Sequence, residues 1–98
     1  MSKISPSVAD ILTASPNQLV LYVYNAAIAA CERGDAPRTR EAIQELDNAL
    51  NYEASPDLAA KFHDLYAQMR DNLDVGKYEP VLKCLTDLRG QFERTVNS

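Results

Sequence analysis

Helix-start and helix-stop residues divide this chain into four segments. Two Ser-Pro pairs, Ser15-Pro16 and Ser55-Pro56, place a capping hydroxyl directly before a proline at the first helical position. Gly34 and Gly76 stand where a helix would end, because glycine adopts the left-handed conformation of a helix C-cap at little cost. The pattern predicts four helices with these approximate bounds: 15 to 33, 35 to 52, 55 to 76, and from 81 onward.

Apolar residues recur at helical spacing in the last three segments, so each presents one apolar face to a common core. The connections are only a few residues long, which forces consecutive helices to lie antiparallel. We therefore predict an all-α fold, an antiparallel up-down-up-down four-helix bundle of residues 15–98, preceded by an N-terminal segment, residues 1–14. The predicted core stripes of the third and fourth helices are Leu58, Phe62, Leu65, Met69 and Leu73, and Val81, Leu85, Leu88, Phe92 and Val96.

The first helix carries more apolar surface than the other three. Its polar residues Gln18, Asn25 and Glu32 fall on one line of a helical projection, and the apolar arc spans roughly 200°, against ~100° for a surface helix. One interpretation is that this helix is the most central one, buried on two sides. The other is that the N-terminal segment, a second subunit or a client protein covers part of the arc. The centre of the arc contains Val20, Val23, Tyr24, Ala27 and Cys31.

The N-terminal segment is itself suited to cover part of that arc. Ile4, Val8, Ile11 and Leu12 are apolar and precede the first helix within reach of its first turns. We hypothesise that residues 1–14 form a removable lid, which competes with a client for one groove.

Charge and hydropathy argue against several classes of protein. The net charge is −4, and the ten basic residues are scattered, which disfavours binding to nucleic acid. The longest apolar run, residues 19–31, is shorter than the ~20 residues of a membrane span, so we expect no membrane insertion. The first residues lack the apolar region of a signal peptide, and Cys31 and Cys84 lack metal-binding spacing. These features predict a cytoplasmic protein.

No pattern typical of catalysis or cofactor binding is found. The sequence lacks a glycine-rich phosphate loop, a Glu-x-x-His metal pair and paired catalytic carboxylates, so we predict no enzymatic activity, metal or cofactor. His63, the only histidine, projects away from the apolar stripe of the third helix, which indicates a solvated surface residue rather than a phosphotransfer site. Tyrosines other than Tyr24 are expected at the edge of the core, with the hydroxyl in water.

The start of the first helix resembles the first-helix signature of the flagellin-specific export chaperones. In that signature, a Thr-Ala-Ser-Pro cap precedes Leu-Val and a Tyr, followed by a small-residue pair and an Ile. Further matches follow in the family's order within residues 43–50, 65–69 and 85–92, so the resemblance covers about residues 11–96. The residues that match the signature are Thr13, Ala14, Ser15, Pro16, Leu19, Val20, Tyr24, Ala27 and Ile28.

The resemblance implies a cytosolic chaperone that binds the disordered C-terminal segment of flagellin, prevents premature polymerisation and aids delivery to the flagellar export apparatus. An export-gate protein is then a further partner, and we expect a monomer or a weak homodimer when no client is bound. The alternative is a structural helical-bundle homodimer, or an interaction adaptor without a secretion client. The arc and the resemblance together predict a client-binding groove formed by Ile11, Leu12, Leu19, Val20, Tyr24, Ala27 and Cys31.

Overall fold

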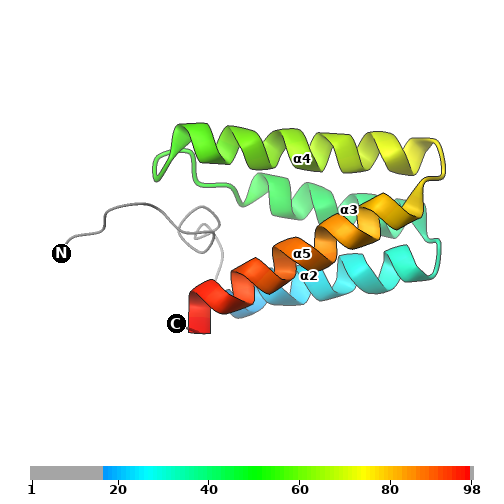
Figure 1. Cartoon of the computed structure of the whole chain (residues 1–98), viewed down its shortest axis with the longest axis horizontal. Coiled ribbons are helices and arrows are strands. Elements are labelled where there is room, and N and C mark those ends of the chain that lie inside the picture. Colours follow the sequence, from blue (N-terminus) through cyan, green and yellow to red (C-terminus); the bar gives the residue numbers. More distant parts are fainter. Residues whose placement is uncertain (1–16, 98) are drawn as a thin grey trace.

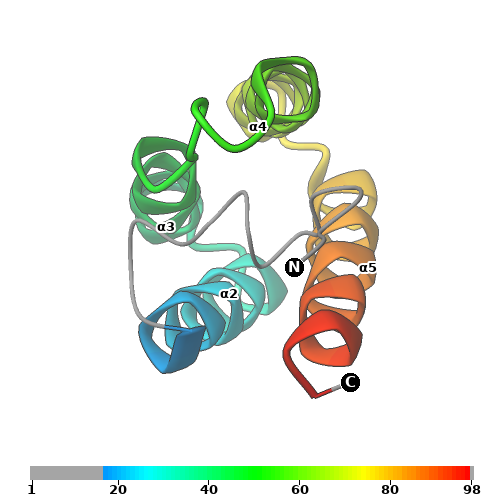
Figure 2. The same ribbon diagram turned by 90° about the vertical axis from the view of Figure 1, so that its left-hand side faces the viewer.

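The computed structural model describes residues 17–97, with side chains from residue 18 to residue 94. Within this range the chain forms four helices: α2 (Asn17–Glu32), α3 (Ala36–Asn48), α4 (Pro56–Asp74) and α5 (Tyr78–Asn97). Successive helices run in opposite directions (Figure 1), and an end-on view places each helix at one corner of a bundle (Figure 2). α2 and α4 each pack against both α3 and α5. The predicted all-α four-helix bundle is confirmed.

The turns between the helices follow the predicted capping chemistry. The Asp35 carboxylate accepts a hydrogen bond from the amide three residues later (3.2 Å) at the start of α3, and the Ser55 hydroxyl does the same (3.4 Å) at the start of α4. Gly34 and Gly76 have φ angles of +72° and +75°, the left-handed conformation predicted for both. The predicted cap of the first helix and the proposed lid in residues 1–14 lie outside the described residues.

Two predicted helix boundaries are wrong by a few residues. α3 ends at Asn48 rather than near Tyr52, because the Leu50 amide bonds to the carbonyl three residues earlier (3.2 Å) and so closes the last turn. α5 begins at Tyr78, before Pro80, because a proline in the first turn removes only an amide that has no helical partner. The order and direction of the helices are unaffected.

The predicted stripes of α4 and α5 supply much of the core. Leu58 and Leu65 are only half-buried, because α4 turns Ala59 and Tyr66 toward the interior as well. The Val96 side chain lies outside the described range. The stripe residues that are buried are Phe62, Met69, Leu73, Val81, Leu85, Leu88 and Phe92.

Two buried tyrosines meet at the centre of the bundle. The hydroxyl of Tyr24 on α2 lies 3.1 Å from that of Tyr66 on α4, and both side chains are 0% exposed. The ring of Tyr24 also packs against Phe92 of α5, with ring centroids 6.0 Å apart. The expectation that Tyr66 keeps its hydroxyl in water is therefore wrong, since the two hydroxyls satisfy each other inside the core.

This tyrosine pair predicts a loss of stability at alkaline pH. Burial raises the pKa of Tyr24 from 10.0 to about 12, and burial likewise raises the pKa of Tyr66. Because the folded pKa lies above the unfolded one, stability is fully present below pH 10.0 and is lost as pH rises toward 12, by roughly 2 kcal/mol for Tyr24. Chemical denaturation across this pH range should show the decline.

Two phenylalanine variants test whether the loss of stability at alkaline pH comes from the buried tyrosine pair. Tyr24→Phe should flatten the dependence of unfolding free energy on pH, because it removes one of the two buried ionisable hydroxyls. Tyr22→Phe should leave the dependence unchanged, because Tyr22 is exposed. Equal slopes for both variants and the parent chain would contradict the assignment to the buried pair.

Candidate functional site

Four of the predicted groove residues lie inside the bundle. Val20, Tyr24, Ala27 and Cys31 are at most 3% exposed and belong to the hydrophobic core. Tyr24, Ala27 and Cys31 therefore do not line an outward-facing surface, and the prediction that they do is wrong. Val20, although 1% exposed, lines a small hollow described below. Leu19 is half exposed, and the two predicted residues of the N-terminal segment lie outside the described residues.

The packing around α2 explains this burial. α3 and α5 flank α2 (Figure 2), and the Tyr24 hydroxyl reaches Tyr66 of α4 across the bundle. At the end of α2, the Cys31 thiol lies 3.5 Å from the carbonyl oxygen of Tyr78 on α5. Contacts with three helices thus cover one side of α2, while the opposite side is exposed. The centre of the apolar arc is therefore buried, as the first of the two interpretations of this arc expects for a helix packed on two sides.

The exposed side of α2 nevertheless carries apolar residues. Tyr22 is 68% exposed, Leu19 is half exposed, and Ala26 and Ala29 are exposed as well. Sequence reasoning missed Tyr22 and Ala29, because both project next to the polar line of the helix. The signal that could have revealed them is an aromatic residue and an alanine in positions where a solvated helix face usually carries charge.

These residues form one wall of an open groove between α2 and α3, called here the α2/α3 groove. Its main part has a volume of about 360 Å³, and a hollow of about 40 Å³ adjoins it toward the start of α2. The main part is lined by Tyr22, Val23, Ala26, Ala29 and Arg33 from α2 and the following turn, and by Arg38, Glu41, Ala42 and Glu45 from α3. The smaller hollow is lined by Leu19, Val20, Val23, Glu45, Leu46 and Ala49.

The groove combines a floor of small apolar residues with a charged border. Small side chains let a second backbone approach closely, because the distance between packed helices depends on the side chains at the contact. Arg33 and Arg38 lie at the end where α2 leads into α3, and Glu41 and Glu45 follow along α3. An apolar centre with a polar rim is the usual anatomy of a surface that binds another polypeptide.

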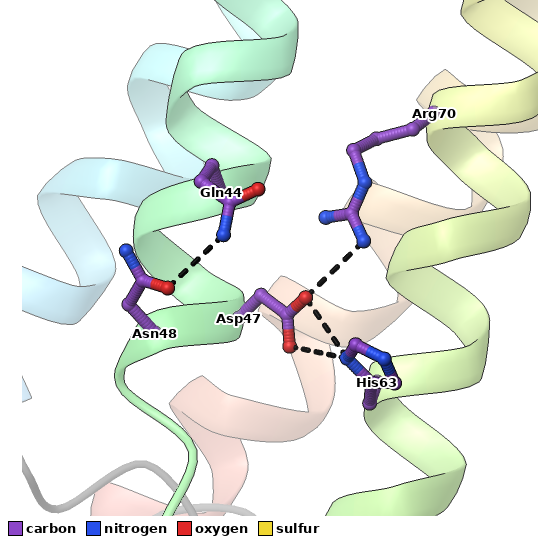
Figure 3. A network of polar contacts seen from close by, with 5 residues as sticks. All are labelled: Gln44, Asp47, Asn48, His63 and Arg70. Atoms are coloured by element: carbon purple, nitrogen blue, oxygen red, sulfur yellow. Dashed lines mark hydrogen bonds and ion pairs between the residues drawn. The ribbon is translucent and has the colours of Figure 1, made fainter.

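A polar cluster connects α3 to α4 on another face of the bundle. Both carboxylate oxygens of Asp47 lie near Nδ1 of His63 (2.9 and 3.0 Å), and Arg70 donates a hydrogen bond to Oδ2 of Asp47 at 3.2 Å (Figure 3). The Asp47 side chain is only 8% exposed, whereas that of His63 is about half exposed. His63 therefore lies at the surface as predicted, and its carboxylate partner is a feature that the sequence did not reveal.

Neither a metal site nor a membrane span is found in the described part of the chain. Among residues 17–97, no group of three or more histidine, cysteine, aspartate or glutamate side chains is placed to hold a metal ion. No helix in the same range is long and apolar enough to cross a bilayer.

Comparisons of the chain with protein-family models, with curated proteins and with solved structures found no match. The α2/α3 groove and the resemblance carried by the sequence are therefore the features of this chain that bear on its function.

Proposed function

We propose that this protein is a chaperone-type binding module that holds an amphipathic segment of a client protein in the α2/α3 groove. The observation that supports this best is Tyr22, an aromatic residue 68% exposed beside a floor of alanines. Tyrosine is among the residues that contribute most to binding free energy when a partner covers them. A groove between two helices accommodates the apolar face of a third helix, a common mode of peptide recognition.

The sequence resemblance supports flagellin as the client and the cytoplasm as the location. A flagellin C-terminal segment that is disordered before assembly exposes amphipathic sequence, which pairs readily with copies of itself. Covering that sequence in the groove prevents premature polymerisation. Ordering a disordered segment lowers the net affinity, which favours release at the flagellar export apparatus. In this proposal an export-gate protein binds the loaded complex.

A pair of tyrosine variants tests the proposal. Tyr22→Asp should weaken binding of a flagellin C-terminal segment by about 30-fold or more, because loss of a central aromatic anchor costs about 2 kcal/mol or more. Tyr52→Asp is the matched control: Tyr52 is 46% exposed but lies in the connection between α3 and α4 and does not line the groove. Its affinity should stay within about 2-fold of that of the parent chain, since surface substitutions away from the interface have small effects.

The measurement is fluorescence anisotropy of a labelled flagellin segment, with circular dichroism to show that both variants keep their helices. Absence of binding by the parent chain, or equal binding by both variants, would refute the proposal. Light scattering tests the remaining alternative, a structural homodimer. A stable homodimer that Tyr22→Asp dissociates would indicate that the groove binds a second copy of this chain instead.

A further inference from the structure

Charged side chains border the α2/α3 groove in a fixed order. Arg38, Glu41 and Glu45 are exposed and follow one another at intervals of three and four residues, so they lie along one side of α3. Arg33 lies at the same end of the groove as Arg38. From the α2–α3 turn toward the end of α3, the border is therefore first positive and then negative.

These charges are largely free to interact with an occupant. The side chains of Arg38, Glu41 and Glu45 form no ion pair with any other residue that the structure describes. Arg33 has only a contact of 3.7 Å with Asp35, and its side chain is 59% exposed. Exposed contacts of this kind contribute little to stability and are readily exchanged for others.

Building on the proposed function, we infer that the natural occupant of the groove is an amphipathic helix with the complementary charge order. It places an acidic group at the end formed by Arg33 and Arg38, and basic side chains along the border formed by Glu41 and Glu45. Charge complementarity of this kind fixes the register of a partner and disfavours segments with the opposite pattern, because like charges would then face each other.

The spacing of the border charges gives the pattern of the occupant. An α-helix rises 1.5 Å per residue, so Arg38 and Glu45 are about 10 Å apart along α3, and a helix lying alongside covers this distance in about seven residues. For an occupant that runs antiparallel to α3, the expected pattern is two bases four residues apart, followed by an acid three residues after the second base, which faces Glu41. The groove from Leu19 to Arg33 is about 21 Å long, which accommodates a helix of about 14 residues.

Two synthetic peptides of about 16 residues, long enough to fill the groove, test the inference. Both have the same apolar face of leucine and alanine and blocked ends. The complementary peptide carries Lys-x-x-x-Lys-x-x-Glu, and the inverted peptide carries Glu-x-x-x-Glu-x-x-Lys. The full chain should bind the complementary peptide at least about 10-fold more tightly. This ratio should fall in ~1 M salt, where charges are screened beyond ~3 Å.

A protein variant with reversed border charges separates the effect of the groove from that of overall charge. The triple variant Arg38→Glu, Glu41→Lys, Glu45→Lys should prefer the inverted peptide. Glu53→Lys is the matched control, since Glu53 is exposed outside the groove and both variants change the net charge from −4 to −2. The control should keep the preference of the parent chain. If the triple variant unfolds, the double variant Glu41→Lys, Glu45→Lys replaces it and should lose the preference.

The outcomes distinguish this inference from the proposed function. Equal affinities for the two peptides, no binding of either, or the same preference in the triple variant and in Glu53→Lys would overturn the inference. If the flagellin segment still binds in a Tyr22-dependent manner, the proposed function stands without the charge rule. A charge preference that reverses as expected, without binding of flagellin, would support the inferred chemistry of the occupant and refute flagellin as the client.

Discussion

Replacing Tyr24 by aspartate should unfold the bundle, with a loss of about 5 kcal/mol or more in unfolding free energy. The Tyr24 side chain is 0% exposed, so the substitution removes a large buried ring and places a carboxylate where water cannot reach it. It also removes the hydroxyl that lies 3.1 Å from that of Tyr66 and the ring that packs against Phe92. The whole stability of a small domain is about 5–15 kcal/mol, so most or all of it would be lost.

The matched control is the same substitution two positions earlier. Tyr22 lies on the same helix but is 68% exposed, so Tyr22→Asp should change the unfolding free energy by only about 0.5 kcal/mol. Thermal melts followed by circular dichroism compare the two variants directly. A cooperative, near-parental melt of Tyr24→Asp would show that Tyr24 is not part of the core. Tyr24 would then be a candidate surface residue for client binding.

Replacing Asp47 by alanine should lower the unfolding free energy by about 2 kcal/mol. The Asp47 carboxylate is nearly buried and pairs with both His63 and Arg70 of α4, so its removal breaks this polar link between α3 and α4 and leaves the arginine without its partner. One nitrogen of Arg70 is already buried without a hydrogen-bond acceptor among the described residues. We place the effect below that of a fully buried ion pair, because His63 is half exposed and water can replace part of its interaction.

Two further variants make the Asp47 prediction specific. Gln44→Ala removes an exposed contact with Asn48 along α3 (3.0 Å, Figure 3) and should cost less than about 0.5 kcal/mol. Arg70→Met, combined with Asp47→Ala, should recover part of the loss, because the half-buried cation that lacks a partner is removed. Urea denaturation of Asp47→Ala, of Arg70→Met and of the double variant measures the coupling free energy between the two side chains. Additive losses for Asp47 and Arg70 would contradict a direct interaction between them.

Much of the fold could be predicted because its signals are local. The Ser55-Pro56 cap and the two glycines act within a single turn, so the start of α4 and the ends of α2 and α4 could be read directly. The end of α3 was placed too late, because Leu50 remains buried after the helix has ended. Leu50 thus belongs to the core without belonging to the helix, and apolar spacing alone does not distinguish the two.

The candidate site was predicted less well, because exposure depends on neighbours that lie far away in sequence. A helical projection showed that α2 has more apolar surface than its partners, and that is correct. It could not show that Tyr66, 42 positions along the chain, meets Tyr24. Nor could it show that α3 leaves Tyr22, Ala26 and Ala29 uncovered.

The sequence by itself determined the number of helices in the described range, their order and their antiparallel connection, since caps, turns and apolar periodicity act over a few residues. Only the tertiary structure decided which side of α2 faces outward and which charges border the groove. It also decided that Asp47 meets His63 and Arg70. The physical reason is that burial and ion pairing are properties of packed helices, and the rotation of each helix in the bundle follows from all of its contacts together.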